Sequence, residues 1–247
     1  MSLWIKICAN TTLSDARLAA DAGADAVGFV FAPSPRRITP QQAAAIVPHL
    51  PPTLEKIGVF VDASFDEIAS TVAAAGLTGV QIHFDAPPEL SAQIRARFGP
   101  GLRILRVVHF DAENAARLTG LVSGHDFSRA ESGGQYKGRA LAPEGAFSDP
   151  HTDAILVDSR TVSAVGGTGK TIDWSVAADT LFQNAKARER RMVAAGGLTP
   201  ENIAEAIATL RPWGVDVVSG VESAPGRKDP AKVRAFIANA LAAADRR

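Results

Sequence analysis

Short apolar runs recur along the chain, and each is separated from the next by an alanine-rich stretch whose apolar positions repeat with helical period. Most of these runs are continuously apolar rather than alternating, which is typical of parallel strands that are covered on both faces. Eight of them are predicted to be strands, at residues 4–7, 26–31, 56–61, 79–83, 102–108, 154–157, 192–195 and 215–218.

Start signals for helices stand between these runs. Thr39 and Ser64 each have the spacing of a capping box, with a glutamine or glutamate three residues further on. Thr199 and Asp229 are each followed by proline, which is favoured at the first helical position, so they predict two more helix starts. In these last two helices, core-facing stripes are predicted at Ile203, Ala206, Ile207 and Leu210 and at Val233, Phe236, Ile237, Ala240 and Leu241.

The alternation of eight strands with about eight helices predicts the α/β class and a single-domain (β/α)8 barrel, often called a TIM barrel, over residues 1–247. A doubly wound open sheet is the alternative. Residues 120–153 do not fit the alternation, because they are rich in Gly, Ser, Pro and charge and far exceed a typical loop between a strand and a helix. They are predicted to be a long insertion between the fifth and sixth strands, either a lid or a surface loop.

Composition narrows the class of partner. Lys plus Arg equals Asp plus Glu at 26 each, so the overall charge gives no reason to expect nucleic acid or an anionic membrane as a partner. No apolar stretch has the length of a membrane span and the N-terminus lacks a signal-peptide core, so we expect a cytoplasmic protein. The single cysteine, Cys8, excludes an internal disulfide, and the chain shows no metal-ligand constellation. A small neutral or anionic substrate is therefore the expected partner.

Reactive residue types follow several predicted strands, where the active site of such a barrel lies. Cys8 ends the first strand and Asp158 the sixth. A thiol acts as a base where positive charge lowers its pKa, and a carboxyl group acts as an acid where its site raises its pKa. Arg36, after the second strand, can bind a carboxylate through its guanidinium group. The alternatives are a core cysteine, a capping aspartate and a surface arginine, and for His83 a structural role is favoured.

Glycine loops follow the last three strands and indicate a phosphate site. In barrels of this type, the loops after strands seven and eight commonly bind phosphate through backbone N–H groups and a helix N-terminus. Tight strand-to-helix turns are the alternative explanation for the glycines. The candidate residues are Gly167, Thr168, Gly169, Gly196, Gly197, Ser219 and Gly220.

The first of these loops also resembles a nucleotide-binding P-loop, because residues 164–171 end in Gly-Lys-Thr. Ala164 stands where the stricter pattern has glycine. Residues 159–163 separate the motif from the preceding strand, and the next helix is predicted to start only near Asp173. A P-loop joins its strand directly to its helix, so nucleotide binding is the weaker alternative.

Taken together, the motifs resemble the phosphoribosylanthranilate isomerase family from end to end. They occur in the family's order: Lys6-Ile7-Cys8, GADAVGFVFAPSPRRI at 23–38, KIGVFVDAS at 56–64, GVQIH at 79–83, ILVDS at 155–159, GGTGKTIDW at 166–174, AAGGLTPENI at 194–203 and VDVVSGVESAPGRKD at 215–229. The sequence departs from the family's pattern at Ala9-Asn10, where glycine usually follows the cysteine, at Phe84-Asp85, and in the length of the insertion.

The resemblance implies an enzyme of tryptophan biosynthesis that converts N-(5'-phosphoribosyl)anthranilate to 1-(2-carboxyphenylamino)-1-deoxyribulose 5-phosphate without a cofactor. It implies that Asp158 protonates the ring oxygen, that Cys8 takes the C2' proton, and that Arg36 holds the anthranilate carboxylate. The glycine loops would hold the phosphate. A phosphosugar-binding barrel without catalysis is a third hypothesis, and both a monomer and a homodimer are compatible with the sequence.

Overall fold

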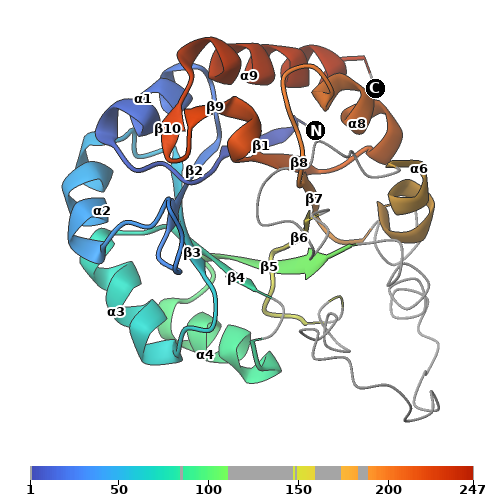
Figure 1. Ribbon diagram of the computed structural model, residues 1–247. Helices are drawn as coiled ribbons and strands as arrows, with labels where there is room; N and C mark the ends of the chain where they lie inside the picture. Colours follow the sequence, from blue (N-terminus) through green and yellow to red (C-terminus); the bar gives the residue numbers. More distant parts are fainter. Residues whose placement is uncertain are drawn as a thin grey trace, which may run out of the picture.

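The protein is a closed barrel of eight parallel strands, paired in sequence order from β1 to β8 (Figure 1). The computed structural model describes residues 2–83, 86–110, 147, 149–158, 174–182 and 189–246. The strands are β1 (Trp4–Ile7), β2 (Ala26–Val30), β3 (Glu55–Phe60), β4 (Gly79–His83), β5 (Arg103–His109), β6 (Ala154–Asp158), β7 (Met192–Ala195) and β8 (Gly214–Val217). The predicted barrel is confirmed, and no strand boundary differs from its predicted position by more than one residue.

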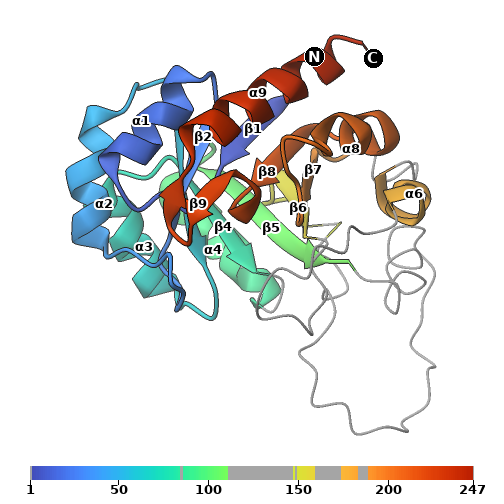
Figure 2. The same cartoon turned by 45° about the horizontal axis from the view of Figure 1, so that its top comes forward.

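Helices pack around the outside of the barrel in the described part of the chain, and the last of them, at the C-terminus, lies beside the first (Figures 1 and 2). They are α1 (Leu13–Asp21), α2 (Pro40–Ile46), α3 (Phe65–Ala75), α4 (Pro88–Phe98), α6 (Trp174–Ala177), α8 (Ile203–Leu210) and α9 (Pro230–Ala244), with the short helices η1 (Val47–His49), η2 (Ala178–Phe182) and η3 (Ser219–Val221). A small hairpin, β9 (Glu222–Ala224) and β10 (Arg227–Lys228), separates η3 from α9.

Most of the predicted helix starts are confirmed. Thr39 and Ser64 both form capping boxes, and Asp229 accepts hydrogen bonds from two backbone N–H groups at the start of α9. The predicted helix start at Thr199 is wrong, because α8 begins only at Ile203. The backbone N–H of Thr199 donates to the side chain of Asn202, and the N–H of Glu201 donates to the Thr199 hydroxyl, so these residues form a turn before the helix. Leu241 is also a wrong prediction: its side chain is 42% exposed, although the rest of its stripe is buried.

The hydrophobic core has two parts, one on each face of the barrel wall. Ile5 and Ile7 belong to the larger part, between the strands and the helices, whereas Trp4 belongs to a smaller cluster with residues from β2, β3, β5, β6 and β7. Because side chains alternate along a strand, Trp4, Lys6 and Cys8 all face the barrel interior. Trp4 lies toward the amino ends of the strands, and Cys8 lies at their carboxyl ends, where the active site is expected.

The predicted insertion at residues 120–153 lies between β5 and β6, and only its last part, 147 and 149–153, is among the described residues. There Asp149 accepts hydrogen bonds from the backbone N–H of His151 and the hydroxyl of Thr152, which form the turn that leads into β6. Residues 164–171 lie outside the described residues, and α6 begins at Trp174, next to the predicted start at Asp173. Within the described part of the chain, no helix has the length and apolarity to cross a membrane.

Candidate active site

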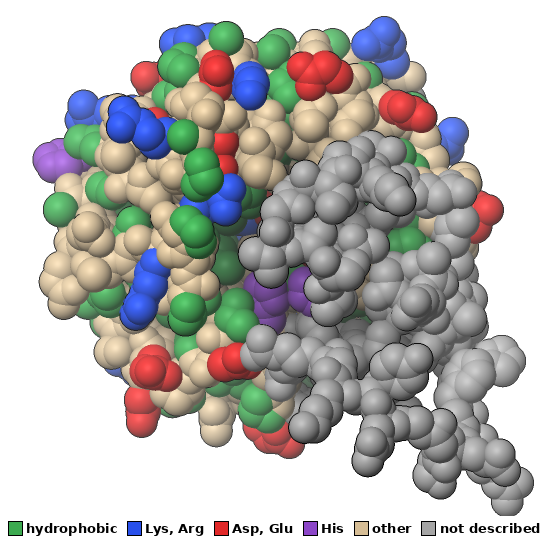
Figure 3. Space-filling view, viewed as in Figure 1, with side chains coloured by type: hydrophobic (Ala, Val, Ile, Leu, Met, Phe, Trp, Pro, Cys, Tyr) green, Lys and Arg blue, Asp and Glu red, His purple; other side chains and the backbone are tan. Residues whose placement is uncertain are grey.

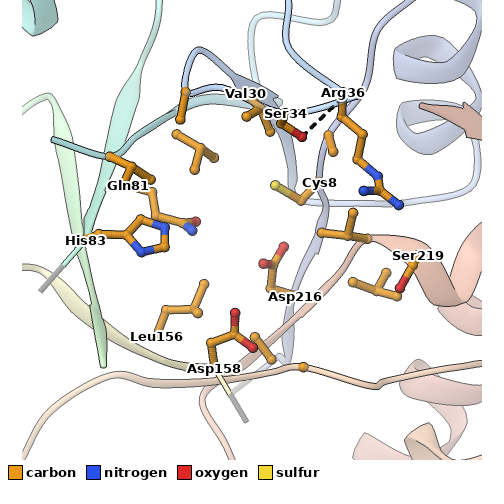
Figure 4. A pocket seen from close by; sticks show the side chains of 18 of the residues that line it. Cys8, Val30, Ser34, Arg36, Gln81, His83, Leu156, Asp158, Asp216 and Ser219 are labelled. Carbon is orange, nitrogen blue, oxygen red and sulfur yellow. Dashed lines mark hydrogen bonds between the residues drawn. The ribbon is translucent and has the colours of Figure 1, made fainter. Parts of the chain in front are cut away.

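A cavity opens at the carboxyl ends of the strands, inside the ring of loops (Figure 4). Histidine side chains reach the surface near the middle of this face of the molecule (Figure 3). Seven of the predicted site residues line the cavity together: Cys8, Arg36, Asp158, Gly196, Gly197, Ser219 and Gly220. The other three, Gly167, Thr168 and Gly169, lie outside the described residues.

Cys8 follows β1 and faces the cavity with only 3% of its surface exposed. Its backbone N–H donates to the carbonyl of Val217, which ties the residue to β8. Gly28 on β2 makes room for the thiol, because a Cβ at that position would overlap the sulfur atom. The next residue, Ala9, is buried and has a φ of 62°, a left-handed conformation that favours glycine. The departure from the family pattern at Ala9 therefore falls where a side chain is strained.

Burial and nearby charges act in opposite directions on the pKa of the Cys8 thiol. Burial raises the pKa of the Cys8 thiol above its ordinary value, and the positive charges of Lys6 and Lys228 only partly offset this effect. Asp216, whose carboxylate also faces the cavity, raises the pKa of the thiol further. Positive charges are therefore present beside the thiol, but in the free protein burial outweighs them and the pKa of Cys8 is raised.

Asp158 is the last residue of β6 and is 4% exposed, with its carboxyl group directed into the cavity (Figure 4). Its backbone carbonyl accepts a hydrogen bond from the N–H of Phe110, just after β5. Cys8 and Asp158 point into the cavity from different sides, so a ligand between them would meet a thiol on one side and a carboxyl group on the other. This is the arrangement that acid–base chemistry on two faces of a substrate needs.

Arg36 lies at the cavity but already pairs with a carboxylate of the protein. Its Nε and Nη2 donate to Glu222 at 2.9 Å to Oε1 and 2.6 Å to Oε2. Hydrogen bonds from Arg36 and the charges of Lys228 and Arg36 outweigh burial, so the pKa of Glu222 lies below its ordinary value and the pair stays ionised. Among the described residues, Nη1 of Arg36 has no hydrogen-bond partner, so this edge of the guanidinium group remains available to a ligand.

The two glycine loops after β7 and β8 pack directly against each other. Gly196 and Gly197 both have left-handed backbone conformations, with φ of 85° and 65°. A Cβ at Gly220 would overlap the carbonyl oxygen of Leu198, so only glycine allows this contact. The loops therefore bring backbone groups and the Ser219 hydroxyl to one side of the cavity, as an anion site requires. Within the described ranges, no group of three or more His, Cys, Asp or Glu side chains is placed to hold a metal ion.

Five polar residues at or next to the cavity were not predicted from the sequence: Lys6, Gln81, Asp216, Glu222 and Lys228. Three of them could have been found from the sequence, because a charged or amide residue stands inside an otherwise apolar predicted strand at positions 6, 81 and 216. His83, for which a structural role was favoured, also lines the cavity, and its ring lies 5.5 Å from that of His109.

The fold and the cavity define a (β/α)8 barrel with a thiol, a carboxyl group, an arginine and two glycine loops at the carboxyl ends of its strands, where enzymes of this fold have their active sites. Comparison with known proteins identifies the family. The family described as "N-(5'phosphoribosyl)anthranilate (PRA) isomerase" matches residues 5–125 and 140–239. The unmatched residues 126–139 fall inside the predicted insertion.

Relatives and solved structures agree with this match over the whole chain. The N-(5'-phosphoribosyl)anthranilate isomerase of Pelobacter propionicus is 42% identical over 234 residues, which cover 94% of this chain and 93% of that protein. The structure of phosphoribosyl anthranilate isomerase from Thermotoga maritima superposes with a TM-score of 0.75 at 35% identity, covering 96% of this chain and 98% of that one. A structure of such an isomerase in complex with reduced 1-(o-carboxyphenylamino)-1-deoxyribulose 5-phosphate gives 0.71 at 32% identity, with the same coverage. The chain belongs to the phosphoribosylanthranilate isomerase family.

Proposed function

We propose that the cavity converts N-(5'-phosphoribosyl)anthranilate to 1-(2-carboxyphenylamino)-1-deoxyribulose 5-phosphate, with Asp158 as the general acid and Cys8 as the general base. The observation that carries the proposal is that the thiol, the carboxyl group, Arg36 and two glycine loops all line one cavity. Family membership supports the reaction, and the positions of the side chains support the roles.

This substrate carries two anionic groups, and the cavity offers a separate partner for each. The anthranilate carboxylate would bind Nη1 of Arg36, the edge of the guanidinium group that Glu222 leaves open. The phosphate would bind the backbone N–H groups of Gly196, Gly197 and Gly220 and the hydroxyl of Ser219, with Gly167, Thr168 and Gly169 as further candidates. This orientation leaves the ribose between Cys8 and Asp158.

The proposed reaction needs only proton transfers. The Asp158 carboxyl group donates its proton to the ring oxygen, the C1'–O bond breaks, and the lone pair of the anthranilate nitrogen forms an iminium ion. The Cys8 thiolate then takes the C2' proton, and the electrons of that bond form the C1'=C2' bond while the iminium π electrons return to nitrogen. The resulting enolamine tautomerises to the ketone, so the mechanism uses no cofactor.

Two further expectations complete the proposal. One related structure is of monomers made from the dimeric phosphoribosylanthranilate isomerase of Thermotoga maritima. A homodimer and a monomer are therefore both states in which this fold occurs, and sedimentation of the full chain distinguishes them.

The cytoplasm is the expected location, because the substrate and product are phosphorylated metabolites.

The test is turnover of freshly generated phosphoribosylanthranilate, followed by the loss of its fluorescence above the spontaneous rate of decay. We expect saturable turnover by the wild type, and a fall in kcat of about 10² or more in Cys8→Ala and in Asp158→Asn, the usual effect of removing a positioned acid or base. Asp66→Asn, at an exposed carboxylate of α3, is the matched control and should retain full activity. Near-normal turnover in either cavity variant would reject the role of that residue.

A further inference from the structure

A buried lysine lies directly beneath the cavity. Lys6 is fully buried on the inner face of β1, two residues before Cys8. Its Nζ lies 2.8 Å from Oδ1 of Asp216 and 2.8 Å from Oε1 of Gln81. Lys6 and Asp216 are also directly opposite each other in the register of β1 and β8. Lysine is rarely buried completely, so two such contacts indicate that its charge is retained for a purpose other than packing.

The Lys6 side chain runs beside the thiol of Cys8. Both residues pack against the same glycine of β2, because a Cβ at Gly28 would overlap the Cys8 sulfur and would lie 3.1 Å from Cε of Lys6. Asp216 faces the cavity from β8, close to Cys8, as Figure 4 shows. The ammonium group is thus fixed by Asp216 and Gln81 at a site next to the sulfur atom.

We propose that Lys6 is a positioning residue for the reaction, and that its ammonium group, held in place by Asp216 and Gln81, stabilises the Cys8 thiolate that takes the substrate proton. The inference rests on the proposed role of Cys8 as the base. Lys6 itself does not touch the substrate, since it lies below the cavity and is not among its lining residues.

The charges around the thiol agree with this role. Burial lowers the pKa of Lys6, but attraction to Asp216 and to Cys8 outweighs burial, so its pKa is raised and the side chain stays an ammonium ion. The charge of Lys6 is the largest influence that opposes burial in lowering the pKa of Cys8, followed among positive charges by Lys228 of β10. Asp216 acts in the opposite direction. Among the described residues, the other titratable side chains that line the cavity are Arg36, His83 and Asp158, and Glu222 pairs with Arg36.

The experiment uses the fact that Cys8 is the only cysteine of the chain, so any alkylation by iodoacetamide reports this thiol alone. The alkylation rate is measured by mass spectrometry across a range of pH, and its midpoint gives the pH at which the thiolate forms. In Lys6→Met we expect the midpoint to rise by about one pH unit or more, with alkylation at neutral pH roughly tenfold slower. A wild-type midpoint in folded Lys6→Met would overturn the proposal.

Three further variants make this comparison decisive. Lys56→Met is the matched control, because Lys56 is a buried lysine of β3 whose Nζ donates to the carbonyl of Pro51 and which does not line the cavity. Its midpoint should equal that of the wild type. If Lys6→Met fails to fold because Asp216 loses its partner, Lys6→Met/Asp216→Asn is compared with Asp216→Asn alone. The double variant should have the higher midpoint, and equal midpoints would overturn the proposal.

Turnover separates this inference from the proposed function. We expect Lys6→Met to lower kcat at neutral pH with little change in KM, and an increase of pH to restore part of kcat in Lys6→Met but not in Cys8→Ala. A raised midpoint with unchanged kcat would overturn the positioning role. No turnover of phosphoribosylanthranilate by the wild type would reject the proposed function, while the alkylation midpoints would still decide whether Lys6 stabilises the thiolate.

Discussion

The two ends of the barrel interior are built from the same strands but differ completely in chemistry. At the amino ends of the strands, Trp4 belongs to an apolar cluster and stacks on Trp213 with ring centroids 5.2 Å apart. The guanidinium groups of Arg103 and Arg191 lie over the Trp213 ring. Two residues further along β1, Lys6 is paired with Asp216. Two residues beyond Lys6, Cys8 lines the cavity. β1 and the residue that follows it therefore supply an apolar side chain at one end, the buried charge of Lys6, and the thiol at the cavity.

This difference separates stability from chemistry along the barrel axis. A (β/α)8 barrel carries its active site at the carboxyl ends of the strands, so the opposite end is free to be packed for stability. Substitutions at the apolar end should lower the free energy of unfolding and leave catalysis of the folded protein intact. Substitutions of polar groups at the cavity should lower kcat or raise KM and leave the free energy of unfolding largely unchanged. Trp4→Ala, Asp158→Asn and Glu222→Gln test this separation.

Trp4→Ala should have the largest effect. Removing a large buried aromatic side chain costs about 3–5 kcal/mol, because it loses transfer free energy and leaves a cavity. Chemical denaturation measures the loss, and kcat of the remaining folded protein should stay close to the wild-type value. Leu241→Ala, at the exposed end of the α9 stripe, is the control and should change the unfolding free energy by less than about 0.5 kcal/mol. A large fall in kcat in folded Trp4→Ala would contradict the separation.

Asp158→Asn should lower kcat strongly and leave the free energy of unfolding nearly unchanged, the opposite of Trp4→Ala. Its expected hundredfold loss of kcat corresponds to about 2.7 kcal/mol of transition-state stabilisation, whereas the unfolding free energy should change little. Parallel measurement of kcat and of the denaturation midpoint distinguishes the two effects. If Asp158→Asn proves mainly destabilising, the carboxyl group acts as a structural cap, which was the alternative reading of this residue.

Glu222→Gln tests whether Glu222 fixes the orientation of the Arg36 guanidinium group for ligand binding. Glutamine has one acceptor oxygen where the carboxylate has two, so the guanidinium group loses its bidentate partner and its fixed orientation. We expect KM to rise by about tenfold, or about 1.4 kcal/mol, with kcat largely retained. The control is Glu205→Gln on the exposed face of α8, which should change neither constant. A loss of kcat at unchanged KM would show that Glu222 acts on the reaction rather than on binding.

Ala9→Gly should have the smallest effect and the opposite sign. Ala9 is buried with a φ of 62°, a conformation that costs a residue with a Cβ roughly 1–2 kcal/mol relative to glycine. Part of this gain is lost because glycine is more flexible in the unfolded chain, so we expect stabilisation of about 0.5–1 kcal/mol. Urea denaturation measures it, and a destabilised variant would show that the strain at Ala9 is already relieved by its surroundings.

Much of the fold could be predicted from the sequence because local patterns determine it. The continuous apolar runs predicted all eight strands, and the capping boxes at Thr39 and Ser64 predicted their helices. Leu241 fits its stripe in periodicity, but it lies near the end of α9, where the helix extends beyond the barrel (Figure 2). Periodicity alone does not show where the core ends.

The site was predictable only where one rule places residues at strand ends. Cys8, Asp158 and the glycines after β7 and β8 follow from that rule. The pairs that adjust the site join residues far apart in the chain, 210 positions for Lys6 and Asp216 and 186 for Arg36 and Glu222, so they depend on the register and curvature of the closed barrel. The effect of burial on the pKa of Cys8 could not be judged from sequence for the same reason.

The most direct test of the account is the pH dependence of kcat/KM for phosphoribosylanthranilate in the wild type and in Cys8→Ala. Cys8 acts as a base only when deprotonated, and burial raises the pKa of its thiol, whereas Asp158 acts as an acid only while it is protonated. We therefore expect a bell-shaped pH profile of kcat/KM in the wild type, and we expect Cys8→Ala to lose the limb that the thiol gives together with at least about 99% of the activity. An identical pH profile in both proteins, or no turnover by folded wild-type protein, would contradict it.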